Sequence, residues 1–133
     1  EDSVKLADYE HVIDLTGSAA FARSAANRIC TIAELPALLD TLLPCILRGN
    51  AMKQLTRTDD GTVYLLLTNN SGVSRTVADG EVFLKEAAEV VTVQTKNDQK
   101  LSMCEGDSEI HRDEDGIYHV EIPAGGWFFG RIH

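Results

Sequence analysis

Short strand-like runs, separated by turn residues, recur about every 8 to 12 residues from Ala51 to the end of the chain. Asp60-Gly61 and Asp115-Gly116 predict hairpin turns, because glycine adopts positive φ angles without steric cost. No helix-length apolar pattern separates these runs, so parallel strands joined by helices are not expected. We therefore expect a mainly-β fold, an antiparallel β-sandwich of the Greek-key type, over residues 51–133.

The apolar pattern of each run predicts how its strand is buried. Val63 to Leu67 reads VYLLL and is apolar on both faces, which predicts a central strand. The run from Ile117 to Ile122 alternates polar and apolar residues, which predicts one solvated face. The expected strands span residues 52–58, 62–68, 73–77, 82–85, 89–95, 100–104, 117–122 and 127–132.

Residues 1–50 have a helical pattern instead. We expect helices over residues 19–29 and, after the capping-box spacing of Thr31 and Glu34, over residues 35–47. The second helix carries one apolar stripe, is kinked by Pro44 and ends at Gly49. The stripe consists of Leu35, Leu38, Leu39, Leu42, Leu43, Ile46 and Leu47. We expect this lead-in to pack on the sandwich or on a catalytic domain outside this chain.

Composition and charge exclude several function classes. Hydrophobic residues make up 44% and charged residues 25%, which is typical of a soluble globular domain, and no apolar run has membrane-spanning length. The net charge is −9, and residues 105–115 contribute six carboxylates against one Arg112. Nucleic acids and anionic membranes are disfavoured as partners, because both require clustered cations. The chain starts at Glu1 without a signal segment, and we expect it to be cut from a larger protein.

The three cysteines, Cys30, Cys45 and Cys104, are odd in number and far apart. Disulfide frameworks and zinc sites need paired or clustered cysteines, so neither is expected. We expect three small buried side chains. Unpaired thiols weakly favour a reducing, cytoplasmic compartment.

The carboxylates cluster in turns, whereas sugar hydrolysis needs two carboxylates facing each other across a cleft. No GxSxG motif places a serine nucleophile either. We expect no catalytic residue in this chain and no cofactor. One alternative stays open. Asp113 and Asp115, together with neighbouring acidic residues, could supply the oxygen ligands of a calcium ion, although the EF-hand spacing is not met.

Trp127 and Tyr118 are the candidate carbohydrate-binding residues. If both were exposed together, their rings could form a platform on which a sugar stacks. The alternative is a Trp127 ring that belongs to the core.

Two stretches carry a resemblance. Both resemble parts of the C-terminal sandwich domain of bacterial-type TIM-barrel glycoside hydrolases. The start of that domain is similar to Arg57 to Asn70 (RTDDGTVYLLLTNN), and its closing hairpin is similar to Asp115 to Trp127 (DGIYHVEIPAGGW). The similarity covers about residues 51–133. It implies that the catalytic carboxylates lie on a barrel outside this chain. It also implies that the domain supports the barrel, sometimes helps it to oligomerise and occasionally contacts glycan.

Three functions therefore stay open. The first is a non-catalytic accessory domain that stabilises or assembles the catalytic domain of a glycoside hydrolase. The second is a carbohydrate-binding module that uses Trp127 and nearby loops. The third is a small stand-alone enzyme or an unrelated ligand-binding sandwich. The expected partners are the catalytic domain, a second copy of the chain, or glycan.

Overall fold

The structure is a computed structural model that describes residues 12–14, 29–78 and 80–133. The chain divides into two compact units, residues 1–43 and residues 44–133, and each is described by itself. Among the described residues, no helix is long and apolar enough to cross a membrane.

The first unit contains a short parallel pair, β1 (Val12–Asp14) and β2 (Ile29–Thr31), followed by helix α2 (Leu35–Leu42). The helix expected over residues 19–29 lies outside the described residues, except that Ile29 belongs to β2. The side chain of Glu34 accepts hydrogen bonds from the amide and the hydroxyl of Thr31 at 2.9 and 2.8 Å. These bonds close a turn, and α2 starts just after it.

The helix expected to continue through Leu47 ends at Leu42, so this prediction was wrong. A proline disfavours the helical conformation of the residue before it, and Leu43 is extended, with φ −75° and ψ 152°. After Pro44 the chain forms strand β3 (Cys45–Arg48), which pairs with a strand of the sandwich. The sandwich unit therefore starts at residue 44 and not at residue 51.

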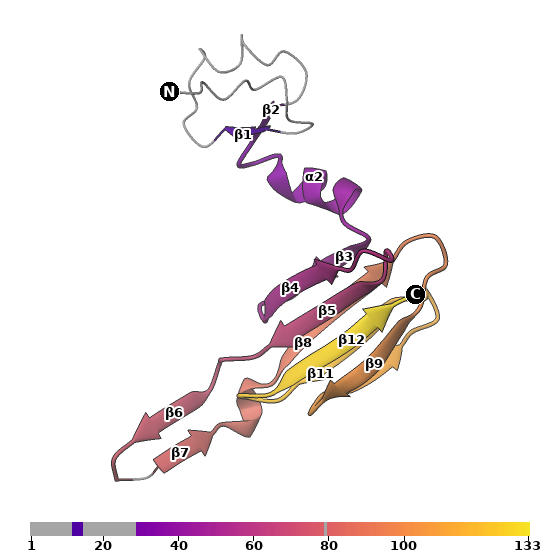
Figure 1. Ribbon diagram of the computed structural model, residues 1–133. Coiled ribbons are helices and arrows are strands. Elements are labelled where there is room, and N and C mark those ends of the chain that lie inside the picture. The colour runs from indigo at the N-terminus through magenta and orange to yellow at the C-terminus, as the bar shows by residue number, and fades with distance from the viewer. Residues whose placement is uncertain (1–11, 15–28, 79) are drawn as a thin grey trace. The chain divides into compact units, whose positions relative to one another are not determined.

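The second unit consists mainly of two four-stranded antiparallel sheets (Figure 1). One sheet has the order β10 (Glu109–Arg112), β11 (Tyr118–Ile122), β8 (Glu89–Thr95) and β3. The other has the order β4 (Met52–Arg57), β5 (Val63–Thr68), β12 (Trp127–Ile132) and β9 (Leu101–Gly106). The expectation of a mainly-β, antiparallel, sandwich-like fold is confirmed.

The core lies between these two sheets. Leu65, Leu67 and Phe128 from one sheet and Val91 and Val120 from the other are all 0% exposed and belong to one cluster. Strand β5 is central, as expected, with β4 and β12 on either side. Strand β11 has the expected solvated face.

Two further elements connect the sheets. A hairpin of β6 (Val73–Thr76) and β7 (Gly80–Phe83) follows β5 and forms a separate two-stranded sheet (Figure 1). The short 3-10 helix η2 (Lys85–Ala87) then leads into β8. The sequence did not predict β3 or β10. Strand β10 lies inside the acidic segment, and only its Ile110 side chain packs on the core, so its apolar signal is weak.

Candidate functional site

The structure does not bring Trp127 and Tyr118 together. Tyr118 belongs to β11, is 6% exposed and lies in the core, with the guanidinium of Arg112 5.3 Å from the centre of its ring. Trp127 belongs to β12 of the other sheet and is half-buried. Neighbouring residues of a strand point to opposite faces, so the buried Phe128 places Trp127 on the outer face. The shared platform predicted from the sequence is therefore corrected.

The outer face of the β4–β5–β12–β9 sheet instead carries an apolar centre, which we call the apolar face. Its residues are Met52, Tyr64, Leu66, Trp127 and Phe129. The rings of Tyr64 and Phe129 are stacked, with centroids 5.4 Å apart and planes 7° from parallel. Met52 is 59% exposed, and the other four side chains are half-buried.

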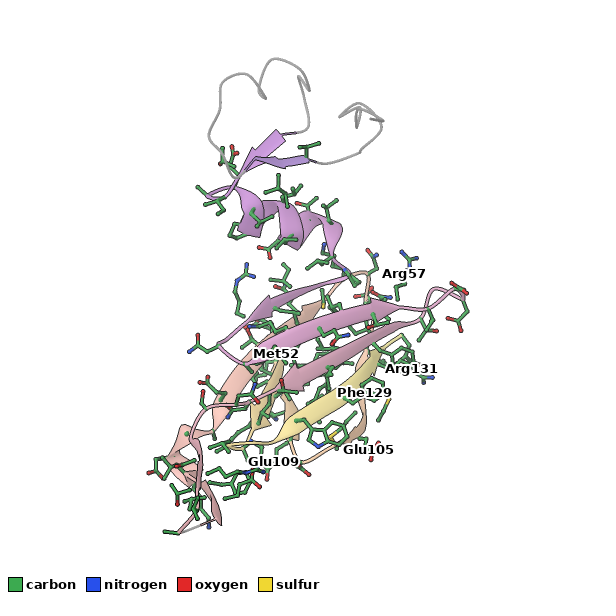
Figure 2. All side chains as sticks on the ribbon, turned by 60° about the vertical axis from the view of Figure 1, so that its left-hand side comes forward. Met52, Arg57, Glu105, Glu109, Phe129 and Arg131 are labelled. Carbon is green, nitrogen blue, oxygen red and sulfur yellow. The ribbon has the colours of Figure 1, made fainter. Side chains whose placement is uncertain are left out.

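Polar side chains surround this centre. One row of paired residues runs across the four strands. Its two central residues are Leu66 and Phe129, and its two ends are polar, with Gln54 on β4 and Glu105 on β9. In the next row Arg131 lies beside Tyr64. Figure 2 labels Phe129 and Arg131 on one strand and Glu105 beside them. The arrangement is an apolar centre within a polar rim.

The outer face of the other sheet is mainly polar. It carries His111 and His119, whose ring centroids are 6.3 Å apart, together with Thr92, Gln94 and Glu121. The apolar exceptions are Val90, which is 48% exposed, and Ile46, which is half-buried and pairs with Gln94. The two outer faces of the sandwich therefore differ in chemical character.

The two candidate calcium ligands lie in the hairpin between β10 and β11. One oxygen of Asp113 accepts a hydrogen bond from the Ile117 amide, and the other lies 2.8 Å from Nε2 of His119. The His119 hydrogen bond, followed by the Ile117 amide, holds the pKa of Asp113 below its usual value. Asp115 is exposed. Within residues 12–14, 29–78 and 80–133, no group of three or more His, Cys, Asp or Glu side chains could hold a metal ion.

The cysteines differ in exposure, and only part of the prediction is right. Cys45 is buried in the core, and this burial raises the pKa of its thiol to about 11. Cys104 is exposed on β9, which contradicts the expectation that all three are buried. The side chain of Cys30 lies outside the described residues.

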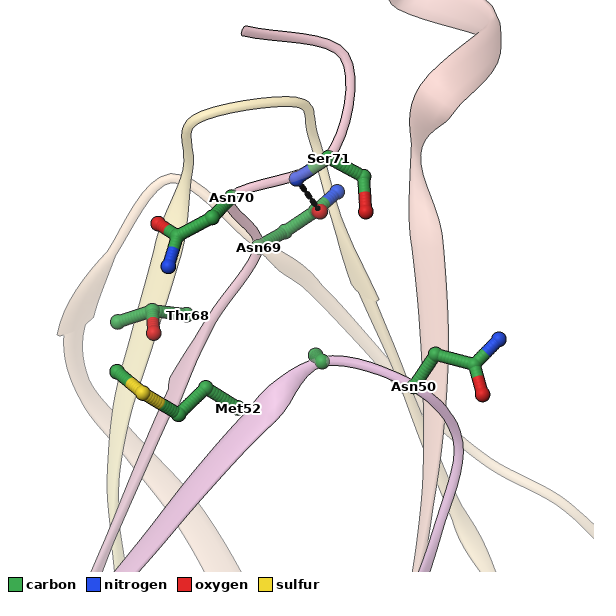
Figure 3. Close-up of a pocket in the computed structure, with 7 residues that line it drawn as sticks. Asn50, Met52, Thr68, Asn69, Asn70 and Ser71 are labelled. Atoms are coloured by element: carbon green, nitrogen blue, oxygen red, sulfur yellow. Dashed lines mark hydrogen bonds between the residues drawn. The ribbon is translucent and has the colours of Figure 1, made fainter.

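A polar pocket of about 300 Å³ opens where β4 begins and β5 ends (Figure 3). Residues 50–52 and 68–71 line it, and none of them is charged. We call it the amide pocket because three asparagines, Asn50, Asn69 and Asn70, contribute to it. Met52 and Thr68 also pair with each other, and Thr68 pairs with Trp127, so the pocket adjoins the apolar face.

Asn69 holds the wall of this pocket in place. It is 1% exposed, and its Nδ2 donates to the carbonyl oxygens of Ala87 and Ile122 at 2.8 and 3.1 Å. Its Oδ1 accepts a hydrogen bond from the amide of Ser71 at 2.8 Å (Figure 3). Asn69 was not among the site residues predicted from the sequence, and its signal there is the Asn-rich turn that follows β5.

Among the residues that the structure describes, the buried hydroxyl of Thr68 has no hydrogen-bond partner. We expect Thr68→Val to raise the free energy of unfolding by about 1 kcal/mol, because valine keeps the shape and removes the unpaired oxygen. Thermal denaturation measures this as an increase of several degrees in Tm. Thr56→Val, at an exposed position on β4, is the control and should change Tm little. A lower Tm for Thr68→Val would show that its hydroxyl has a partner.

In comparisons with family models, with curated proteins and with solved structures, the chain has no match. What the site can do is therefore inferred from its geometry and chemistry.

Proposed function

We propose that this chain is a non-catalytic accessory domain of a larger carbohydrate-active enzyme, and that it packs against the catalytic domain through the apolar face. The resemblance to the C-terminal sandwich domains of glycoside hydrolases motivates this proposal. The observation that carries it is the difference between the two outer faces of the sandwich.

An antiparallel sheet with one solvated face normally shows polar side chains there, as the β10–β11–β8–β3 sheet largely does. The apolar face departs from this rule through Trp127, Phe129, Tyr64 and Met52. Aromatic residues and methionine are enriched in the centres of protein interfaces, with polar residues at the rim. The face extends about 13 Å along the strands and, over three strands, about 10 Å across them. These dimensions suit the water-free centre of an interdomain contact.

The experiment compares two substitutions in the parent enzyme. Leu66→Glu places a charge at the centre of the apolar face, and we expect it to weaken domain packing by about 1 to 3 kcal/mol and to lower the Tm of the catalytic domain. Val90→Glu places the same charge on the other outer face and should leave that Tm unchanged. Equal effects of the two variants contradict the proposal. Circular dichroism of each isolated variant checks that the sandwich itself still folds.

A second candidate function is carbohydrate binding, which a separate observation favours. Trp127 is paired with Thr68, so an aromatic side chain lies next to a pocket lined with amides and hydroxyls. Sugars present both apolar ring faces and hydroxyl groups, and this combination suits them. Calorimetric titration with neutral oligosaccharides tests this function, and flat heats across a broad panel exclude it. Turnover of aryl-glycosides by this chain would overturn the non-catalytic assignment.

A further inference from the structure

We propose that the amide pocket binds the terminal ring of a neutral oligosaccharide as an uncharged pyranose. This inference rests on the carbohydrate-binding function proposed above and adds the position and the chemical class of the ligand.

The size of the pocket is consistent with one sugar ring. Its volume of about 300 Å³ lies at the lower end of the range for small-molecule sites. The pocket opens at the ends of two neighbouring strands, so the remaining rings of a saccharide can extend outside it. A terminal unit therefore fits better than an internal one.

The hydrogen-bonding groups of the pocket match sugar hydroxyls. Asn50 and Asn70 are both exposed, and their amide groups lie on opposite sides of the pocket (Figure 3). An amide offers an acceptor oxygen and two donor hydrogens, while each hydroxyl both donates and accepts. One amide can thus bond two adjacent hydroxyls of a pyranose.

The uncharged lining of the pocket favours a neutral ligand. Its lining has no cation that could pair with a carboxylate or sulfate, and burying an unpaired charge is costly. Outside the lining, one charge of each sign lies nearby. An oxygen of Glu89 lies 3.5 Å from the Ser71 hydroxyl, and the ammonium of Lys53 donates to the Ala51 carbonyl at 3.0 Å, so these surroundings favour neither an anionic nor a cationic sugar. The lining also lacks a carboxylate for the ammonium group of an amino sugar. A neutral hexose or pentose binds without burying an unpaired charge.

The pocket is held in shape before a ligand arrives. Asn69 connects residue 71 to the end of β11 and to η2 through the three hydrogen bonds described above. Its backbone also bonds to Gly125 and Gly126. A wall that is already ordered avoids part of the entropy cost of binding. The exposed Met52 lines the pocket and Trp127 lies next to it, and both offer apolar contact to a second ring.

The test is a titration of the 133-residue chain with neutral trisaccharides such as cellotriose, maltotriose, mannotriose and xylotriose. Amide chemical shifts and calorimetry give the residues affected and Kd. We expect shifts at residues 50–52 and 68–71 with at least one trisaccharide. We also expect Kd to be about tenfold weaker in Asn70→Ala and in Asn50→Ala, as loss of hydrogen bonds predicts. The control Gln94→Ala removes an exposed amide from the other sheet and should leave Kd unchanged.

The outcomes separate the inference from the functions on which it rests. Shifts confined to Tyr64 and Phe129 would overturn the pocket but keep carbohydrate binding. Equal Kd values for a neutral trisaccharide and a glucuronate-terminated one would overturn the neutral specificity. No shift with any saccharide would overturn both the pocket and the carbohydrate-binding function. The accessory role would remain, because the Leu66→Glu comparison tests it separately.

Discussion

Replacing Phe128 with alanine is expected to lower the free energy of unfolding by about 3 to 5 kcal/mol. Phe128 is 0% exposed and lies between the two sheets. A Cβ at Gly130 would lie 2.5 Å from Cε1 of this ring, so the glycine leaves space that the ring fills. No side chain at residue 130 can refill that space, and a cavity would remain. Domains of this size are stable by only about 5 to 15 kcal/mol, so the variant would be close to unfolding.

Urea denaturation measures this loss, and Phe129→Ala is the matched control. The two residues are the same type and adjacent, but Phe129 points to the outer face and is half-buried. Removing its ring lowers the free energy of unfolding by about 1 kcal/mol through the lost stacking with Tyr64, and by a further amount through the lost burial of part of the ring. If Phe129→Ala lost as much stability as Phe128→Ala, the assignment of inner and outer faces would be wrong.

Replacing Asn69 with alanine is expected to cost about 2 to 4 kcal/mol. The substitution leaves the carbonyls of Ala87 and Ile122 and the amide of Ser71 without their partner. These groups belong to three separate segments, so their loss loosens the connection between the two sheets at this end. Asn70→Ala is the control: its side chain is exposed, and we expect a change within about 0.5 kcal/mol.

Asn69→Asp adds a pH dependence with a defined sign. It would place a buried carboxylate against two carbonyl oxygens, which raises the folded-state pKa of that carboxylate above its unfolded value of about 3.9. A raised folded pKa means that stability is lost as pH increases through that pKa. We therefore expect the variant to be nearer to wild type at pH 4.5 than at pH 7, as measured by denaturation at both values. An equal loss at both values would show that residue 69 is solvated.

Local sequence signals predicted much of the sandwich. The observed bounds of β8 (Glu89–Thr95) and β12 (Trp127–Ile132) are those expected from the sequence. Gly61 and Gly116 have φ angles of 86° and 81°, as the hairpin turns required. Strand propensity, alternation and turn glycines act over a few residues, so they can be read without knowing the fold.

Contacts between residues far apart in the sequence determined which strand faces are buried, where β3 forms and how the amide pocket is built. Alternation places Trp127 and Phe128 on opposite faces, but only the second sheet determines which of them is buried. Ile46 and Leu47 fit a helical stripe equally well, and pairing with β8 makes them part of a strand. The partners of Asn69 lie 18 and 53 residues away in the chain. The amide pocket and its support therefore exist only once these distant segments are folded together, because a buried hydrogen bond depends on distance in space and not on distance in sequence.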